Sequence, residues 1–333
     1  MQITKIQVVC PSGAVTGGPE SLHNLVALLR TIGEVAEIVY HPFPKVSHTP
    51  EEYRDYGAKS SPISDERGTL VILPEILCFE AKRFSESIVA IWWLSVDNFR
   101  EKKYHNWRDP FRYIKKCFVG QRPWRGVRAL RQYLHFSKSY YDLTYLMEQQ
   151  ISPFQLTGPV STTYTNEIEH SKTSVCRKNE ILYNPKKGRK TIHRLMAACP
   201  EWLFVPLVGH DQGALISKYR ESKLYIDFGH HPGRERMPRE AAACGCCVIT
   251  GVLGSAGNAV DIPIPRKFKI NEHNHDFIEQ FRAIVSHVFD DFEAATKEFD
   301  AYRLEIRSEP QRQKEDIKNI LEALRTNSRI GGL

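Results

Sequence analysis

The sequence predicts an α/β fold built from two Rossmann-like domains, and three observations support this prediction. The chain of 333 residues has room for about two domains, at ~150 residues per domain. Residues 5–31 have the pattern of a strand, a Gly-Gly loop and an amphipathic helix, and residues 181–198 repeat the order strand, loop, helix. Residues 224–258 add a strand, a loop, a short helix and another strand, which is the repeating unit of a parallel sheet.

Composition indicates the class of protein and its compartment. The chain is 41% hydrophobic and 26% charged, which is ordinary for a protein with sizeable cores. Its N-terminus lacks the apolar run of a signal peptide, and its best apolar stretch, residues 87–96, is about half of a membrane span. The eight cysteines follow no disulfide framework, and Cys244, Cys246 and Cys247 lack the second cluster that a metal site needs. We therefore expect buried thiols, no metal site and a reducing cytoplasm.

The first domain, residues 1–155, is expected to hold strands whose carboxyl ends carry acidic residues. The expected strands cover residues 5–10, 35–40, 70–73 and part of 87–95, and residues 48–65 are expected to form an exposed excursion. Glu75 follows the third strand and Asp97 the fourth. Because the carboxyl ends of parallel strands meet at one edge of a sheet, both are candidate catalytic bases or acceptor-binding groups. The alternative for each is a helix cap or an ordinary loop residue.

Residues 100–132 differ from the rest of the chain in charge. They contain eleven Lys or Arg and two acids, a balance of 11 − 2 = +9, whereas the whole chain has a net charge of +7. Aromatic residues are interleaved with these cations: Tyr104, Trp107, Phe111, Tyr113, Phe118 and Trp124. This mixture suits an anionic membrane surface, single-stranded nucleic acid, or a solvated basic face whose aromatic side chains point into the core. In the membrane interpretation, docking would use Lys102, Lys103, Arg108, Arg112, Lys115 and Lys116.

A linker over residues 156–178 is expected to lead into a second domain over residues 179–300, followed by a helical tail at 301–333. Within this half the expected strands are 181–183, 204–207, 224–228 and 246–250, and the expected helices are 191–198, 211–219, 239–243, 274–289, 292–306 and 314–324. Gly245 is placed to end the short helix at 239–243.

Two loops of this second domain should leave the same sheet edge. The first carries His231, Arg234 and Arg236 just before Glu240, and the second carries Gly254 and Ser255. Cations and free backbone amides bind phosphates, and a carboxylate can accept hydrogen bonds from a diol. The sequence therefore predicts a site for a phosphorylated ligand that bears hydroxyl groups.

The stretch 224–258 resembles the donor-binding segment of GT-B glycosyltransferases, above all their large retaining family. The family pattern, roughly Glu-Gly-Phe-Gly-Leu-Pro-x-x-Glu-Ala-x-Ala-x-Gly-x-Pro-Val-Ile, is matched by Pro238, Glu240, Ala241, Ala243, Gly245, Val248 and Ile249. The resemblance implies that Glu240 holds the ribose of a nucleotide sugar. Pro232 occupies the position of the family's first glutamate, so the resemblance implies neither its sugar contact nor retention of configuration.

Weaker resemblances to the same enzymes occur elsewhere in the chain. Gly17 and Gly18 match a Gly-Gly-x-Glu segment that lies near the donor diphosphate, and Gly209 matches a Val-Gly turn near the nucleotide base. A strand followed by cations resembles the start of the GT-B donor domain, which implies that Lys186, Lys187 and Arg189 neutralise the diphosphate. The resemblance also implies two domains that face each other across a cleft, with C-terminal helices that cross back to the N-terminal domain.

The function that these residues and the resemblance predict is transfer of a sugar, hexosyl-like, from a nucleotide sugar to an acceptor hydroxyl. We expect a metal-independent enzyme with no cofactor, which acts on a glycan or lipid-linked acceptor in bacterial-type surface polysaccharide or glycoconjugate synthesis. It would work in the cytoplasm or on the inner face of the membrane. A sugar-nucleotide epimerase of the same fold is one alternative. A nucleic-acid-binding protein is another, although it leaves the 224–258 pattern unused, and a nicotinamide enzyme is not favoured because G-x-G-x-x-G is absent.

Overall fold

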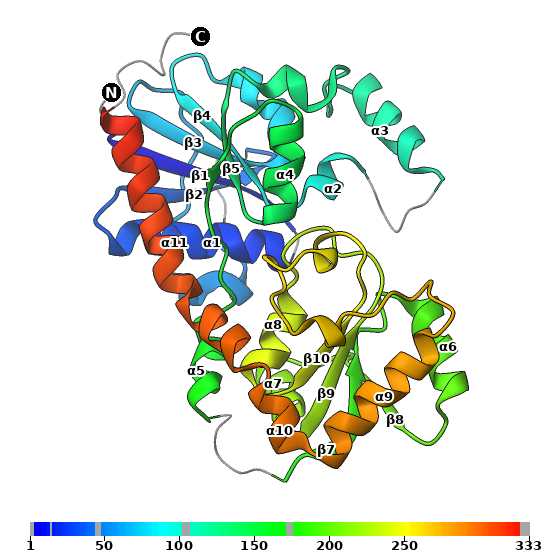
Figure 1. Ribbon diagram of the computed structural model, residues 1–333. Coiled ribbons are helices and arrows are strands. Elements are labelled where there is room, and N and C mark those ends of the chain that lie inside the picture. Colours follow the sequence, from blue (N-terminus) through cyan, green and yellow to red (C-terminus); the bar gives the residue numbers. More distant parts are fainter. Residues whose placement is uncertain (1–2, 14, 44–47, 102–106, 171–175, 327–333) are drawn as a thin grey trace. The chain divides into compact units, whose positions relative to one another are not determined.

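The computed structural model describes residues 3–13, 15–43, 48–101, 107–170 and 176–326 (Figure 1). The chain divides into two compact units. Unit 1 comprises Met1–Gly158 and Gln311–Leu333, and unit 2 comprises Pro159–Pro310. Each unit contains one parallel sheet with helices, so the predicted α/β class is confirmed.

The sheet of unit 1 has six strands in the order β2-β1-β3-β4-β5-β6, and every neighbouring pair is parallel. The strands are β1 (Lys5–Pro11), β2 (Ala36–His41), β3 (Thr69–Pro74), β4 (Ile88–Trp93), β5 (Leu134–Ser137) and β6 (Phe154–Gln155). The strand order reverses direction at β1 and β3, and such a reversal separates the loops that follow the two strands. In open α/β sheets this point is the usual place for a ligand.

Helices cover both faces of this sheet because its strands are apolar on both sides. One face packs against α1 (Gly17–Thr31) and the end of α11 (Asp300–Thr326), and its core includes Trp92. The other face carries Trp93 and packs against the remaining helices. These are η2 (Glu75–Arg83), α2 (Val96–Phe99), α3 (Asp109–Phe118), η3 (Gly126–Leu130) and α4 (Tyr140–Glu148). The exception is η1 (Glu51–Tyr56), which contacts α1.

The sheet of unit 2 has four parallel strands in the order β10-β9-β7-β8. The strands are β7 (Lys178–Tyr183), β8 (Leu203–Pro206), β9 (Ser222–Asp227) and β10 (Cys247–Thr250). The helices are α5 (Thr162–His170), α6 (Arg189–Ala198), α7 (Gln212–Glu221), α8 (Arg236–Ala243), η4 (Ser255–Gly257), η5 (Arg266–Phe268), α9 (Phe277–Asp290) and α10 (Phe292–Lys297). The switch in strand order lies between β7 and β9, which places the loops after these two strands at the expected ligand position.

The C-terminal helices differ from the sequence prediction. Instead of helices at 292–306 and 314–324, the chain forms the short α10 and then α11, which continues through Pro310. An internal proline costs a helix ~3 kcal/mol. Burial on both sides of it offsets that cost, because Ile306 lies in the core of unit 2 and Ile317 and Ile320 lie in the core of unit 1. The predicted return of the C-terminal helix to the N-terminal domain is confirmed.

Two further features concern the predicted linker and the cysteines. Part of segment 156–178 forms helix α5, whose Tyr164 and Ile168 belong to the core of unit 2, so this segment is more ordered than its composition suggests. All eight cysteines are free, and every one except Cys176 is buried, as predicted. Among the described residues, no helix is long and apolar enough to cross a membrane.

Candidate functional site

Two loops meet at the switch point of the unit 2 sheet. Residues 184–188 follow β7, and residues 228–235 follow β9. Gly188 and Gly229 both have positive φ, at 55° and 93°. A Cβ on Gly188 would lie 2.5 Å from the carbonyl oxygen of Phe228, and a Cβ on Gly229 would lie 2.9 Å from the amide nitrogen of Gly188. Glycine is therefore required for the two backbones to touch.

A third loop, residues 251–258 after β10, is bonded to the second. The amide of His231 donates to the carbonyl of Leu253 at 3.1 Å, and the amide of Ser255 donates to the carbonyl of His231 at 2.9 Å. The Ser255 hydroxyl donates to the carbonyl of Gly233. A Cβ on Gly254 would overlap the His231 carbonyl, so this position also requires glycine. The structure thus brings His231, Gly254 and Ser255 together, as the sequence predicted for loops of one sheet edge.

Lys187 is the cation that the structure places at the switch point. Its ammonium lies 3.6 Å from Asp227 Oδ1 and 3.2 Å from Glu235 Oε2, and its side chain is 13% exposed. Burial favours the neutral amine, yet the two carboxylates raise the pKa of Lys187. Burial likewise opposes ionisation of Asp227, but Lys187 and His231 lower its pKa to about 2. Both groups are therefore charged at neutral pH, and Lys187 is held between two anions.

Glu240 and Arg236 form a second charged pair on α8. Arg236 Nε lies 2.7 Å from Glu240 Oε1, one helical turn away. The Glu240 side chain is almost fully buried, whereas that of Arg236 is 43% exposed. The helix begins at Arg236, three residues before the predicted start, and the positive φ of Gly245 follows its end as predicted. A hydroxyl-bearing ligand would have to share the Glu240 carboxylate with Arg236.

Arg234 has a different environment from the other predicted cations. Its guanidinium is buried and binds Glu305 and Glu309 of α11, 3.1 Å from Glu309 Oε1. Arg239 binds the other oxygen of Glu309 at 2.8 Å. These pairs connect α8 and its preceding loop to the C-terminal helix. The assignment of Arg234 to the donor site remains a prediction from the sequence.

The remaining donor candidates of unit 2 are more exposed. Lys186 lies in the loop after β7, and Arg189 is the first residue of α6; both side chains are exposed. Gly209 follows the edge strand β8 with φ of 70°, and a Cβ there would meet no atom within 4 Å. Backbone conformation, and not a close approach, is thus the reason for glycine at position 209.

The predicted residues of unit 1 lie near its own switch point. Gly17 and Gly18 begin α1, and a Cβ on Gly18 would make an ordinary contact with Leu94 at 3.8 Å. Asp97 is fully buried in α2 and accepts a hydrogen bond from the Tyr141 hydroxyl at 3.1 Å. Its role as a base stays a prediction.

Glu75 is buried directly after β3 and has a perturbed pKa. One oxygen accepts the amide of Leu94 at 3.0 Å, and the other accepts the side-chain amide of Asn98 at 3.5 Å. Burial raises the pKa of Glu75 to about 7, although these two hydrogen bonds favour the carboxylate. A carboxyl with a pKa near neutrality can act as a general acid or base.

Sequence reasoning missed Asp227, Glu235 and Lys269. Asp227 ends β9 and Glu235 precedes α8, so their positions at a strand end and a helix start were the available signals. Lys269 gave no local signal. Its ammonium donates to the carbonyls of Ala256 and Asn258 at 2.9 and 2.5 Å and so supports the third loop. Burial lowers the pKa of Lys269 to about 8.

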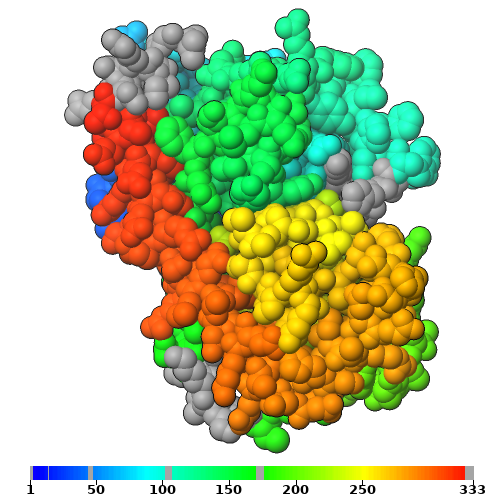
Figure 2. Space-filling view, viewed as in Figure 1, coloured from blue at the N-terminus to red at the C-terminus, as the bar shows by residue number. Residues whose placement is uncertain are grey.

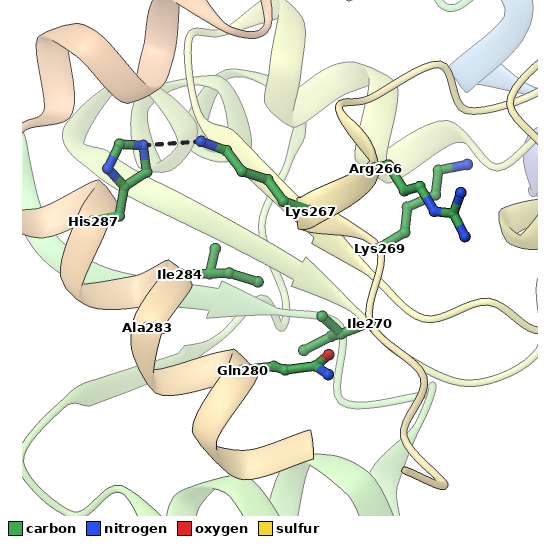
Figure 3. Close-up of a pocket in the computed structure, with 8 residues that line it drawn as sticks. All are labelled: Arg266, Lys267, Lys269, Ile270, Gln280, Ala283, Ile284 and His287. Carbon is green, nitrogen blue, oxygen red and sulfur yellow. Dashed lines mark hydrogen bonds between the residues drawn. The ribbon is translucent and has the colours of Figure 1, made fainter. Parts of the chain in front are cut away.

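A cavity of about 760 Å³, which Lys269 helps to line, lies between η5 and α9 (Figure 3). It is lined by Arg266, Lys267, Lys269, Ile270, Gln280, Ala283, Ile284 and His287. Figure 3 shows the ammonium of Lys267 directed at the ring of His287, at 3.4 Å, and Glu298 binds both. None of these residues was predicted as a site residue, and the cavity is distinct from the three loops.

Two parallel α/β units, with a helix that starts in the second and ends in the first, define the GT-B fold of glycosyltransferases. Solved structures with this fold match nearly the whole chain. Sucrose-phosphate synthase from Thermosynechococcus elongatus matches with a TM-score of 0.67 and 10% identity, over 98% of this chain and 100% of that chain. Anabaena HepE in complex with UDP-glucose matches with a TM-score of 0.65 and 10% identity, over 96% and 99%.

A glycosyltransferase from Rickettsia africae matches with a TM-score of 0.63 and 14% identity, over 97% of this chain and 99% of that chain. No protein-family model and no curated protein sequence matches the chain. The likeness therefore establishes the fold, which agrees with the fold that the sequence resemblance implied.

Proposed function

We propose that this protein is a glycosyltransferase that moves a sugar from a nucleotide sugar to an acceptor hydroxyl. The observation that carries the proposal is the position of Lys187. Lys187 is a charged, mostly buried cation at the switch point of the unit 2 sheet, where the loops after β7 and β9 need glycine to approach each other. Glu240 lies on α8, the helix that follows the second of these loops. The GT-B likeness over 96–98% of the chain supports the same function, since Anabaena HepE was solved with UDP-glucose.

The diphosphate and the ribose of a nucleotide-sugar donor each have a matching group in this proposal. Lys187 exchanges a carboxylate partner for the diphosphate, and the exposed Lys186 and Arg189 add positive charge. Glu240 accepts hydrogen bonds from the ribose diol while it keeps Arg236 as its neighbour. In the reaction the acceptor oxygen bonds to the anomeric carbon as the bond from that carbon to the diphosphate breaks. Cations near the diphosphate stabilise the leaving group, and a basic carboxylate, Glu75 or Asp97, accepts the hydroxyl proton.

The finer features of the proposal concern sugar, acceptor and metal. We infer a hexosyl-like donor and an acceptor on a glycan or lipid-linked glycan of the kind that surface polysaccharide synthesis uses. Side chains of this chain, and not a metal ion, neutralise the diphosphate in this mechanism.

Nucleotide binding to the intact protein tests the proposal. Thermal unfolding should be measured with UDP, GDP, ADP, CMP and dTDP, because a ligand at about a hundred times its Kd stabilises the folded state by ~2.7 kcal/mol. We expect one nucleoside diphosphate to raise the Tm clearly above the others. The Lys187→Met variant should lose this shift, whereas Lys223→Met, in the same unit but bonded to the carbonyl of Phe289, should keep it. If no nucleotide moves the transition of the native protein, the donor site is wrongly assigned.

A further inference from the structure

The segment 107–124 exposes a row of large apolar side chains, which we name the aromatic ridge. It consists of Trp107, Phe111, Ile114, Phe118, Val119 and Trp124, with exposed fractions from 43% to 76%. Among the residues that the structure describes, every exposed Trp or Phe belongs to this ridge. Figure 1 shows α3 at the margin of unit 1, and Figure 2 shows atoms of the same colour on the surface there. This result overturns the interpretation in which these aromatic side chains point into the core; of the described ones, only Tyr113 is half-buried.

The ridge follows the helical period. Residues 107, 111, 114 and 118 are separated by four, three and four positions. Phe111, Ile114 and Phe118 therefore share one side of α3, and Trp107, two residues before the helix, continues the spacing. On an ordinary surface helix such an apolar stripe faces the core, but here the buried residues of α3 are Asp109 and Cys117. The aromatic rings pair with each other: Trp107 with Phe111 at 6.1 Å and Phe118 with Trp124 at 4.8 Å, both edge to face.

Buried contacts fix the segment that carries the ridge. Arg122 is buried and donates to the carbonyls of Phe99 and Ile76 at 3.1 and 3.0 Å, and it also binds Glu101. The Tyr113 hydroxyl donates to the carbonyl of Pro123 at 3.0 Å. Because these bonds hold residues 122–123 against α3 and the neighbouring part of unit 1, the exposed rings are a feature of the folded unit.

The charge around the ridge indicates what covers it. Residues 107–132 contain eight Lys or Arg, and all except the buried Arg122 reach the surface: Arg108, Arg112, Lys115, Lys116, Arg125, Arg128 and Arg131. Their single acid, Asp109, is buried and paired with Arg112. A second copy docked through the same surface would bring like charges together. The ridge includes the aliphatic side chains of Ile114 and Val119, which cannot stack on bases as single-stranded nucleic-acid binding requires.

We propose that the aromatic ridge inserts into the headgroup region of an anionic membrane, with the surrounding cations on its lipid phosphates. An interfacial helix of this type places aromatic and aliphatic side chains among the acyl chains and cations at the surface. The sequence predicted docking from the mixture of cations and aromatic residues, and two of the six cations named for it, Lys102 and Lys103, lie outside the described residues. The ridge adds an apolar term, so binding should weaken with salt but persist where purely electrostatic binding would be lost.

Vesicle binding of the full chain tests this. We expect co-sedimentation with phosphatidylcholine vesicles that contain phosphatidylglycerol, and at least tenfold weaker binding to phosphatidylcholine alone. Phe111→Ser with Phe118→Ser should reduce binding to the anionic vesicles at least tenfold at physiological salt. The matched control is Leu203→Ser with Leu304→Ser, two exposed apolar residues of unit 2 at 58% and 63%, which should bind like the native protein. Both variants should keep the native Tm and nucleotide response, which separates this proposal from the donor site.

Tryptophan fluorescence supplies an independent measurement of insertion. Trp107 and Trp124 are exposed, whereas Trp92 and Trp93 are fully buried. Brominated acyl chains should therefore quench part of the native fluorescence, and Trp107→Ser with Trp124→Ser should remove that quenching. Absence of vesicle binding at low salt overturns the proposal. So does binding that ignores the ridge variants, a dimer that those variants dissociate, or ridge-dependent binding of an oligonucleotide in place of vesicles.

Discussion

At the level of single residues, the charged groups of the candidate site already have partners in the unliganded protein. Lys187 lies between Asp227 and Glu235, and Glu240 lies against Arg236. Buried charges need such partners, because an isolated one loses its hydration without compensation. A ligand must then replace one partner by an equivalent group. For Lys187 the replacement of a carboxylate contact by a phosphate contact keeps an anionic partner beside the ammonium.

Glu240→Gln tests the residue that carries the resemblance. The amide keeps the size of the side chain but loses the charge that strengthens hydrogen bonds from a diol, so nucleotide affinity should fall by about 1.5–3 kcal/mol. The Tm of the empty protein should change little, because the partner Arg236 is 43% exposed and such pairs are weak. Isothermal titration with the nucleotide that raises the Tm measures the loss. Glu201→Gln, which breaks a surface pair with Arg282, is the control; equal affinity in both variants would make Glu240 a structural residue.

Glu75 should give the protein a measurable pH dependence of stability. Its pKa is about 7 in the folded chain against an ordinary value of 4.5. Between these values the folded state keeps a proton that the unfolded state releases, so the free energy of unfolding falls as pH rises from about 4.5 to 7. At ~1.4 kcal/mol per pKa unit the total is about 3 kcal/mol. Urea unfolding across this pH window should show a shallower slope for Glu75→Gln.

The control for this measurement is Glu148→Gln, at an exposed position of α4. It should keep the native slope. Identical pH profiles for the native protein and Glu75→Gln would mean that Glu75 ionises normally in the folded chain, and would remove the argument for Glu75 as a base.

At the level of elements, contact between backbones builds the three loops of the candidate site. Gly188, Gly229 and Gly254 lie where a Cβ would collide with the neighbouring loop. The parallel strands bring the loops to one edge, and the missing side chains let amide and carbonyl groups of different loops bond to each other. Lys269 stabilises the third loop by donating hydrogen bonds to two of its carbonyl groups.

Gly254→Ala tests how tightly the third loop packs against the second loop at the His231 carbonyl. Gly254 and Gly209 have nearly equal φ, 68° and 70°, and alanine at Gly209 should cost about 1–2 kcal/mol for the positive φ. Gly254 also has ψ of −137°, a conformation almost restricted to glycine, so alanine there should cost about 1–3 kcal/mol for the backbone alone. Gly209→Ala meets no atom, whereas Gly254→Ala meets the His231 carbonyl, and the added overlap should cost a further ~1–3 kcal/mol. Chemical unfolding of the two variants measures the difference. Equal losses would show that the loops can move apart freely.

At the level of the whole molecule, charge and the C-terminal helix link features far apart in sequence. The stretch 100–132 has a charge of +9 and the whole chain has a net charge of +7, so the remaining residues sum to about −2. This local excess surrounds the aromatic ridge, in a different unit from the candidate donor site. Helix α11 belongs to both units, and its Glu309 binds Arg234 and Arg239 beside the site. Residues of α11 therefore belong to both units, and its part in unit 2 reaches the candidate site.

The sequence by itself determined the two parallel sheets, the loops that carry the candidate site and eight of the ten described strands, whereas the bounds of β5 and β6 were not predicted. Apolar runs such as 70–73 form strands wherever both faces are covered, and glycine and proline mark their ends, so these signals are local. The resemblance around Glu240 is also a local signal, because its residues lie within one strand–helix–strand unit, and it predicted the fold.

Only the tertiary structure decided which charges meet and which side chains stay exposed. Arg234 binds Glu309, which lies 75 positions later in the chain (309 − 234), and Lys269 supports a loop through backbone carbonyls that no sequence pattern reveals. The outward direction of the aromatic ridge was likewise open, because an amphipathic period gives the stripe but not the side on which the protein lies. Ion pairs and exposure depend on long-range packing, and packing is the one property that a local pattern cannot contain.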